Sequence, residues 1–480
     1  MNFNNIKHLN KGTLINIAAV LAGSIILLCI GIFILSTKDD NGNNDQKTEF
    51  SGYSKAENDS SKDSETQNTS DSPTTTTKVQ SETDSQTKDT SSSNTEQTTT
   101  VKITETTEIK TTPKEITTEN QTTKPVTTSP PETPDEKVER ILAGLTLEEK
   151  VYQMFILAPE HLTGANSVTQ AGDITKNAIQ QYPVGGLIYF SNNIINENQL
   201  TTMLANTQKY SMERCGLKMF LCIDEEGGRV ARIGNNSSFH VEKFPDMAYI
   251  DSEAKAYHVG ETIGTYLSKY GFNVDFAPDA DVITESRNTV IGTRSFGTDP
   301  SVVSKMALAV AKGLNSTGVM STYKHFPGHG ATVGDTHEGF AYTEKTEAQL
   351  MQSELIPFLD AAKSGYVDMV MIAHISVPNI VGDNTPSSLS YKIVTGILKE
   401  KLGYKGLIVT DALNMGAIAK NYTSANAAIL AVKAGNDLLL MPKNFKEASQ
   451  AIIQAVKNGE ISEERINESV RKIIKAKLNL

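Results

Sequence analysis

The sequence predicts an α/β protein whose folded part is a (β/α)8 barrel of the TIM type. Three observations predict this class. Short apolar, β-rich runs recur eight times after residue 134, stretches with helical spacing separate them, and polar residues close most of the runs. Buried parallel strands have this composition, and in a barrel they alternate with helices. A doubly wound open sheet is the structural alternative.

The first 37 residues predict a membrane anchor. Residues 1–12 contain Lys7 and Lys11, and the uncharged apolar run 13–37 follows. A run of this length spans the ~30 Å hydrocarbon core, and the flanking lysines place residues 1–12 in the cytoplasm. We therefore expect a single-pass protein of the cell membrane with its folded domain outside the cell. A cleaved signal peptide is the alternative, but no small-x-small site ends the run.

Residues 38–133 predict a disordered linker. Ser or Thr occupies 17 of the 30 positions from Asp71 to Thr100, and no Phe, Tyr or Trp occurs between Ser54 and Val151. Such a segment buries too little apolar surface to offset the entropy of ordering it. The linker lets a tethered domain reach away from the membrane, and we place the barrel at residues 134–480.

The overall composition excludes two classes of protein. The net charge is −11, so the chain lacks the basic surface of a nucleic-acid binder, and we expect no nucleic-acid partner. Three cysteines do not make a disulfide-rich scaffold. Cys215 and Cys222 are close enough in sequence to form a bridge, but two small buried thiols are the favoured interpretation.

A helical lead-in at 135–154 opens the folded part, and eight strand-like runs follow it. The runs are 154–159, 185–190, 219–224, 273–278, 318–324, 367–374, 406–411 and 437–442. Helix-like patterns fill the gaps at 252–270, 299–316, 344–364 and 414–434, and 461–478 reads as a closing helix.

Ionisable residues gather where these runs end. In a barrel of this type the active site lies at the carboxyl ends of the strands. A single Asp at a strand end is usually structural, but five strand ends carry ionisable groups here. These are Asp224 with Glu225 and Glu226; Asp275 with Asp279 and Asp281; Lys324 with His325 and His329; His374; and Asp411.

Two kinds of chemistry fit these residues, because the chain has no GxSxG elbow, P-loop, HExxH motif or dinucleotide fingerprint. Glycoside hydrolysis needs a carboxylate nucleophile and a proton donor. A metal-dependent hydrolase is the second, with a zinc cluster of His325, His329, Asp335 and His337. Lys324 next to this cluster disfavours a dication, so we favour sugar chemistry and expect no metal or cofactor.

Four motifs in order resemble the catalytic barrel of glycoside hydrolase family 3. They are IDEEGGRVARI, IGTRSFG, YKHFPGHG followed by DTH, and IVTDALNM. More narrowly, they are similar to those of the bacterial β-N-acetylglucosaminidases (β-hexosaminidases) of this family. The similarity runs from about Leu145 to Leu480.

The resemblance implies roles for individual residues. It implies that Asp411 is the nucleophile and that His337, with Asp335, forms the general acid/base dyad on a mobile loop. It implies that N-acetylglucosamine is held by Asp224, Arg232, Arg294, Lys324 and His325. The resemblance assigns neither role to Glu225 or Glu226, which we expect to be structural.

These roles agree with general chemistry. A carboxylate that attacks the anomeric carbon forms a covalent glycosyl-enzyme, which water then resolves with retention of configuration. A histidine has an unperturbed pKa near 6.5, so it donates and then accepts a proton near neutrality. Asp335 would fix the tautomer of His337 and stabilise its cationic form.

The sequence thus predicts a retaining exo-β-N-acetylglucosaminidase that is monomeric and acts on N-acetylglucosaminides such as peptidoglycan fragments (muropeptides). A phosphorolytic enzyme, in which phosphate replaces water, is the first alternative. A non-catalytic cell-wall-binding surface protein is an alternative from another class, and the metal-dependent hydrolase is the third.

Overall fold

Eight parallel strands form a nearly closed barrel in the computed structural model, which describes residues 132–480. The expected cytoplasmic segment, the membrane anchor and all but the last two residues of the linker lie outside the described residues. Within residues 132–480, no helix is both long and apolar enough to cross a membrane.

The eight predicted strands are confirmed, each within its predicted run or extending two residues past it. They are β1 (Phe155–Leu157), β2 (Gly186–Ile188), β3 (Phe220–Ile223), β6 (Val274–Asp275), β7 (Met320–Phe326), β8 (Met369–Ile372), β9 (Leu407–Thr410) and β10 (Leu439–Leu440).

The strand order excludes the doubly wound alternative. Going around the sheet, the order β10-β1-β2-β3-β6-β7-β8-β9 follows the chain without the reversal that a doubly wound sheet needs. The two ends of this order are joined by a parallel bridge between Val409 and Leu438, and the Leu438 amide donates to the Ile408 carbonyl at 2.9 Å. The carboxyl ends of all eight strands therefore surround one opening.

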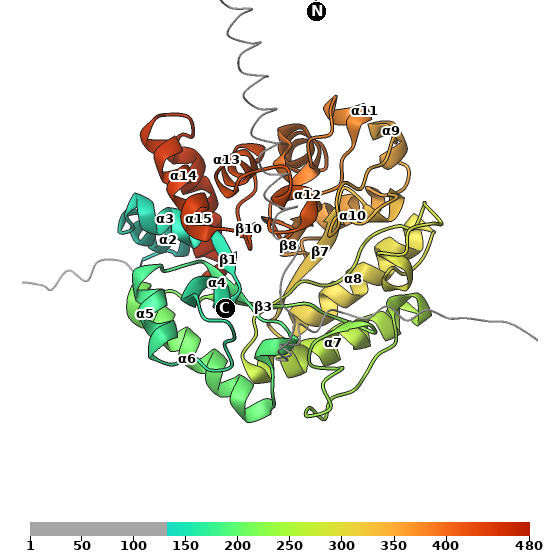
Figure 1. The fold of residues 1–480 in the computed structure, drawn as a ribbon. Helices are drawn as coiled ribbons and strands as arrows, with labels where there is room; N and C mark the ends of the chain where they lie inside the picture. Colours follow the sequence, from blue (N-terminus) through green and yellow to red (C-terminus); the bar gives the residue numbers. More distant parts are fainter. Residues whose placement is uncertain (1–131) are drawn as a thin grey trace, which may run out of the picture. The chain divides into compact units, whose positions relative to one another are not determined.

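Helices surround the barrel (Figure 1). They are α2 (Pro134–Ala143), α3 (Leu147–Gln153), α4 (Pro159–Thr163), α5 (Asp173–Gln181), α6 (Glu197–Cys215), α7 (Glu253–Tyr270), α8 (Pro300–Ser316), α9 (Glu347–Leu350), α10 (Ile356–Ser364), α11 (Pro378–Val381), α12 (Gly416–Ala419), α13 (Ser424–Ala434), α14 (Phe445–Lys457) and α15 (Glu463–Lys477). A π-helix, η7 (Lys392–Lys401), lies between β8 and β9.

Local signals explain where these helices begin and approach one another. The Asp299 side chain accepts from the amides of Ser301 and Val302, which caps the start of α8. Helices α7 and α8 then pack closely because glycines face the contact. A Cβ on Gly260 would lie only 2.1 Å from the Val310 carbonyl oxygen, so the two backbones can meet only without that side chain.

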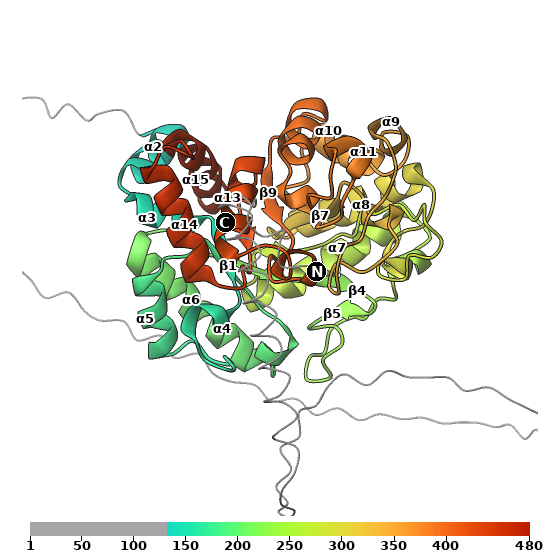
Figure 2. The same ribbon diagram turned by 45° about the horizontal axis from the view of Figure 1, so that its top comes forward.

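Three predicted helical stretches are divided, and one hairpin is not predicted by the sequence. The 135–154 stretch forms α2 and α3, the 344–364 stretch forms α9 and α10, and the 414–434 stretch forms α12 and α13. Directly after β3 the chain forms the short antiparallel hairpin of β4 (Glu225–Gly227) and β5 (Val230–Ala231), which stands beside the barrel (Figure 2).

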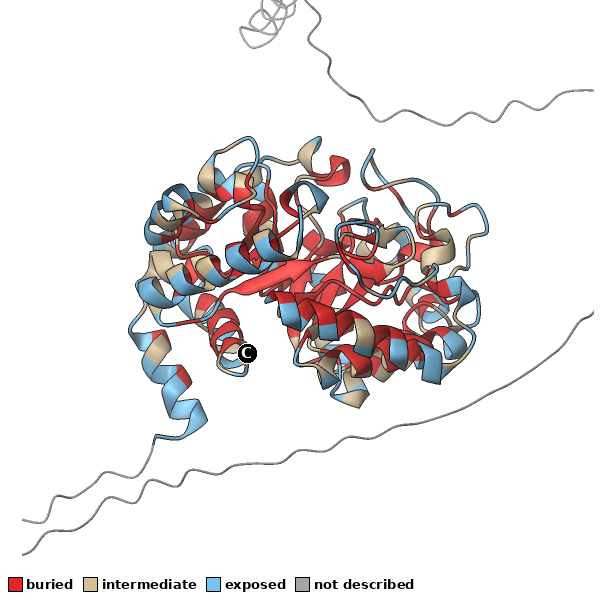
Figure 3. Ribbon diagram, turned by 90° about the horizontal axis from the view of Figure 1, so that it is seen from below, coloured by how far each residue is buried: buried red, intermediate tan, exposed pale blue. Residues whose placement is uncertain are grey.

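The barrel strands are buried, while most of the helices around them expose an outer face (Figure 3). Cys215 and Cys222 are free thiols, as the favoured interpretation expects, but only one of the two is buried as that interpretation also expects. Cys222 is buried in β3, whereas Cys215 is partly exposed at the end of α6.

Candidate active site

A cavity of about 380 Å³ opens at the carboxyl ends of the strands. Its charged and titratable lining is Asp224, Glu226, Arg232, Arg294, Lys324, His325, His337 and Asp411. Every residue that the sequence predicts for the site is in this set except Asp335, which lies behind His337. The apolar lining includes Phe190, Phe276, Met415 and Met441.

Two larger hollows do not share this chemistry. One of about 520 Å³ lies at the amino ends of β7–β9, and one of about 760 Å³ lies between α4, α13 and the start of α14. Asp411, His337, Arg294 and Lys324 line neither of these hollows. The smaller cavity is therefore distinguished as the candidate active site by its charged and titratable side chains and not by its volume.

A buried charge network forms one wall of the cavity. Arg294, from the short helix η4 (Gly292–Arg294), donates to both carboxylate oxygens of Glu226 at 2.9 and 2.7 Å. Lys324, on β7, lies 2.6 Å from the same carboxylate. Burial opposes ionisation of Glu226, but the charges of Arg294 and Lys324 outweigh it and lower its pKa. Glu226 is thus ionised and holds Arg294 and Lys324 in place at the wall of the cavity.

Asp224 stands at the end of β3, between two of the predicted sugar-binding cations. Its carboxylate accepts from Lys324 Nζ at 3.0 Å and lies 3.5 Å from Arg232. Burial lowers the pKa of Lys324, but the charges of Asp224 and Glu226 outweigh this and raise it. Lys324 is therefore charged, and this wall of the cavity offers alternating acceptors and donors, as the hydroxyl groups of a sugar require.

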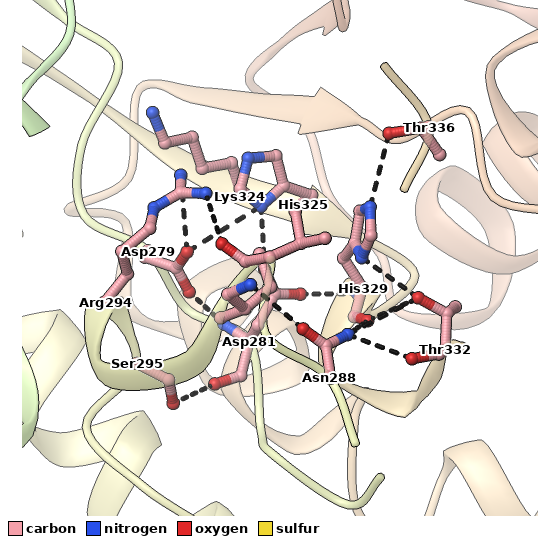
Figure 4. Close-up of polar contacts among 12 residues, drawn as sticks. Asp279, Asp281, Asn288, Arg294, Ser295, Lys324, His325, His329, Thr332 and Thr336 are labelled. Atoms are coloured by element: carbon pink, nitrogen blue, oxygen red, sulfur yellow. Dashed lines mark hydrogen bonds and ion pairs between the residues drawn. The ribbon is translucent and has the colours of Figure 1, made fainter. Parts of the chain in front are cut away.

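His325 is held by carboxylates beneath the cavity (Figure 4). Its Nδ1 lies 2.7 Å from Asp281 Oδ2 and 3.9 Å from Asp279. Burial and the charge of Arg294 lower the pKa of His325 to about 4, so the ring is neutral near neutrality. Nδ1–H then donates to Asp281, and Nε2 is left as an acceptor.

Asp279, next to Asp281, is also a weakened acid. Burial and the charge of Asp281 raise the pKa of Asp279 to about 7. Its Oδ2 has no hydrogen-bond partner among the described residues and lies 3.6 Å from Arg294.

Asp411 follows β9 immediately and lines the cavity. Its amide donates to the Ile372 carbonyl at 2.9 Å, and its Oδ1 accepts from the Ala412 amide at 2.7 Å. Burial disfavours the carboxylate, but His374, His325 and the Ala412 amide favour it, and the pKa of Asp411 is lowered. The Asp411 carboxylate is therefore ionised near neutrality, as attack on an electrophilic carbon requires.

His337 lines the same cavity from an exposed loop after β7. Its Nδ1 lies 2.7 Å from Asp335 Oδ1, and its amide donates to the same oxygen at 2.8 Å. Burial opposes ionisation of Asp335, but these two bonds to His337 outweigh it and lower its pKa. The structure thus brings Asp335 and His337 together as the sequence analysis expects, and Nδ1–H···O leaves Nε2 free to exchange a proton.

Three further strand-end residues are structural. Glu225 accepts from the amides of Ile233 and Gly234 and from the Tyr266 hydroxyl, so it anchors the β4–β5 hairpin. Asp275 accepts from the Glu225 amide. His374 bonds to Ser388 Oγ at 2.8 Å and to the Ala412 carbonyl at 2.9 Å, so it supports the segment that carries Asp411.

The zinc cluster considered in the sequence analysis does not assemble in residues 132–480. Its four members, His325, His329, Asp335 and His337, do not form a ligand group there. The described residues bring together a different set, Asp279, Asp281 and His325. The His325–Asp281 hydrogen bond and the nearby Arg294 guanidinium account for that set without a metal ion.

Comparisons with known proteins agree with this geometry. The sequence profile of the glycosyl hydrolase family 3 N terminal domain matches residues 146–476. Beta-hexosaminidase A of Pseudoalteromonas piscicida is 34% identical over 325 residues, which cover 63% of this chain and 54% of that protein. Beta-hexosaminidase LpqI of Mycobacterium tuberculosis is 29% identical over 69% of this chain and 83% of its own length.

Among solved structures, a family 3 beta-N-acetylglucosaminidase from a Paenibacillus species superposes with a TM-score of 0.65 and 35% identity. The match covers 70% of this chain and 62% of that one. The chain therefore spans little more than half the length of some relatives. The barrel, the site residues at its strand ends and the profile match lead to one conclusion: this chain belongs to glycosyl hydrolase family 3, and residues 146–476 match the domain that the family profile describes as N-terminal.

Proposed function

We propose that the protein is a retaining exo-β-N-acetylglucosaminidase. One observation carries the proposal: an ionised carboxylate, Asp411, and a histidine paired with a carboxylate, His337–Asp335, line one cavity beside a fixed array of charges. These are the groups that double displacement at an anomeric carbon requires. The relatives named beta-hexosaminidase support N-acetylglucosaminides as substrates.

In the first step Asp411 attacks the anomeric carbon as the bond to the leaving oxygen breaks. His337 gives a proton to that oxygen, and a covalent glycosyl-enzyme forms. In the second step His337 takes a proton from water, which attacks the same carbon and releases Asp411. Two inversions retain the configuration. Asp335 stabilises the cationic form of His337, which exists before the first proton transfer and again after the second.

The remaining cavity residues would bind the sugar. Asp224, Arg232, Arg294, Lys324 and His325 would hold the hydroxyl groups of the non-reducing residue. The positions of Arg294, Lys324 and His325 are fixed before substrate arrives, because Glu226 and Asp281 already hold them. Such preorganisation reduces the cost of ordering the site during the reaction.

We further propose that the substrates are peptidoglycan fragments and that the enzyme is anchored to the membrane with its catalytic domain outside. The sequence of residues 1–133 is the support for this location. A tethered enzyme outside the membrane meets wall fragments that end in N-acetylglucosamine.

The test uses the full chain with 4-nitrophenyl β-N-acetylglucosaminide and 4-nitrophenyl β-glucoside, with and without EDTA and with and without phosphate. We expect turnover of the acetylated substrate alone, insensitive to both additions. Phosphate stimulation would favour the phosphorolytic alternative, and loss with EDTA the metal-dependent one. A folded protein inactive on both substrates would contradict the proposal and favour a binding role.

A further inference from the structure

The loop that carries His337 is anchored at its base, where it leaves the barrel. Asn288 Nδ2 donates to the carbonyls of His329 and Thr332 at 2.8 and 3.1 Å. His329 is buried, and its Nε2 lies 3.3 Å from Thr336 Oγ1 (Figure 4). These contacts hold the base of the loop and Thr336, but they do not reach His337 itself.

The tip of the loop rests on α12. The Gly416 amide donates to the His337 carbonyl at 3.2 Å, and the Ala417 amide donates to the Thr336 carbonyl at 3.0 Å. The Lys420 ammonium donates to the Glu338 carbonyl. Gly416 and Ala417 open α12, and the first amides of a helix have no partner within the helix. The loop carbonyls therefore take the hydrogen bonds that α12 leaves open.

This contact is close enough to require glycine at position 416. A Cβ there would lie 2.5 Å from the His337 carbonyl oxygen and 3.0 Å from the Glu338 carbonyl carbon. Both neighbours are backbone atoms, so they cannot move aside as a flexible side chain would. Gly416 is buried and does not have a left-handed φ. An added methyl group would therefore displace the loop without straining the backbone at Gly416.

Helix α12 also follows the nucleophile in the chain. Gly416 is five residues after Asp411, and the Leu413 amide donates to the Leu440 carbonyl at 2.9 Å, which ties the intervening segment to β10. The nucleophile and the surface on which the acid/base loop rests thus belong to one short, anchored segment.

We propose that Gly416 is a positioning residue: the contact that its missing side chain permits between α12 and the loop sets where His337 stands relative to Asp411. This inference rests on the proposed function, because it concerns the general acid/base of that reaction. A displacement of about 1 Å in a reacting group can cost on the order of 10²-fold in rate. The loss should fall on proton transfer, since Asp411 forms its hydrogen bonds with Ile372 and Ala412, and Glu226 holds Arg294 and Lys324.

The experiment compares Gly416→Ala with Gly339→Ala in the full chain. Gly339 lies in the same loop, has no left-handed φ, and a Cβ there would meet nothing within 4 Å. The two variants therefore make the same chemical change with and without a collision. The readout is kcat/KM, which reports formation of the glycosyl-enzyme, on 4-nitrophenyl β-N-acetylglucosaminide and on chitobiose.

We expect Gly416→Ala to lower kcat/KM on chitobiose by roughly 30–100-fold and on the activated aryl substrate by less than about threefold, because a good leaving group needs little protonation. Gly339→Ala should match the wild type on both. Equal losses of Gly416→Ala on the two substrates, or no loss, would overturn the proposal. If Gly416→Ala does not fold, Lys420→Met is the second test, because it removes the side-chain contact that Lys420, at the end of α12, makes with the loop. It should also lower kcat/KM on chitobiose more than on the activated substrate, but by a smaller factor.

Amide hydrogen exchange separates this inference from the proposed function. In the wild type and in Gly339→Ala, the Ala417 amide should be protected by the Thr336 carbonyl, and Gly416→Ala should expose it. Unchanged protection in Gly416→Ala would refute the contact whatever the activity. A wild type inactive on both glycosides, with the exchange result as expected, would refute only the proposed reaction.

Discussion

Lys324 Nζ lies 2.6 Å from Glu226 Oε1, and each side chain is only 3% exposed. An ion pair that is buried to this extent needs further charged partners to be stable. Here Arg294 pairs with Glu226, and Asp224 pairs with Lys324. The pair lies on the wall that would face the sugar, so its removal should change stability and binding together.

Glu226→Gln should therefore destabilise the protein by about 3–5 kcal/mol, because it leaves Lys324 and Arg294 buried without their shared anion. It should also raise KM for the aryl glycoside more than it lowers kcat. Chemical unfolding and steady-state kinetics check both. Glu285→Gln, which breaks the exposed pair with Arg287, is the matched control and should leave the unfolding midpoint unchanged. Equal effects of the two changes would contradict this account of the network.

Asp411→Asn should lower kcat by more than about 10³-fold, since an amide cannot form the glycosyl-enzyme. The circular dichroism spectrum should remain that of the wild type. Asp251→Asn is a suitable control because Asp251 is exposed and forms its ion pair with Lys255, outside the cavity. Substantial residual turnover in folded Asp411→Asn would assign the nucleophile role to another residue.

His337→Ala should impair glycosides with poor leaving groups by about 10²–10⁴-fold and activated aryl glycosides much less. The physical reason is that protonation of the leaving oxygen matters little when that oxygen is already a stable anion. His240→Ala replaces an exposed histidine outside the cavity and should have no effect. Equal losses on both kinds of glycoside would remove the acid role from His337.

Asp279→Asn should become stabilising relative to the wild type as the pH rises. The pKa of Asp279 is raised to about 7 from 3.8, so its neutral form contributes stability that is fully present below pH 3.8 and is lost as the pH rises through 7. Asn resembles the neutral form and does not ionise. The variant's unfolding free energy minus that of the wild type should thus increase between pH 4 and 7, by up to about 1.4 kcal/mol for each pH unit. Thermal melts at pH 5 and pH 8 measure the difference, and a decrease with pH would show that folding lowers the pKa of Asp279.

The sequence by itself determined the barrel and most of the cavity's residues. Runs such as 406–411 are apolar along most of their length because barrel strands are buried on both faces. This local pattern can be recognised in the sequence alone. The motifs that end those runs supplied Asp224, Lys324, His325 and Asp411, because the carboxyl ends of parallel strands converge on one opening.

Only the tertiary structure decided which of these residues act on one another. Glu225 and Glu226 are adjacent in sequence, yet one anchors a hairpin and the other holds Arg294, 68 residues away, and Lys324. Successive side chains along an extended segment point to opposite sides, so two neighbouring glutamates enter different surroundings. The need for glycine at 416 is likewise invisible in sequence, since it arises from a loop that lies roughly 80 residues earlier and meets α12 only in the folded chain.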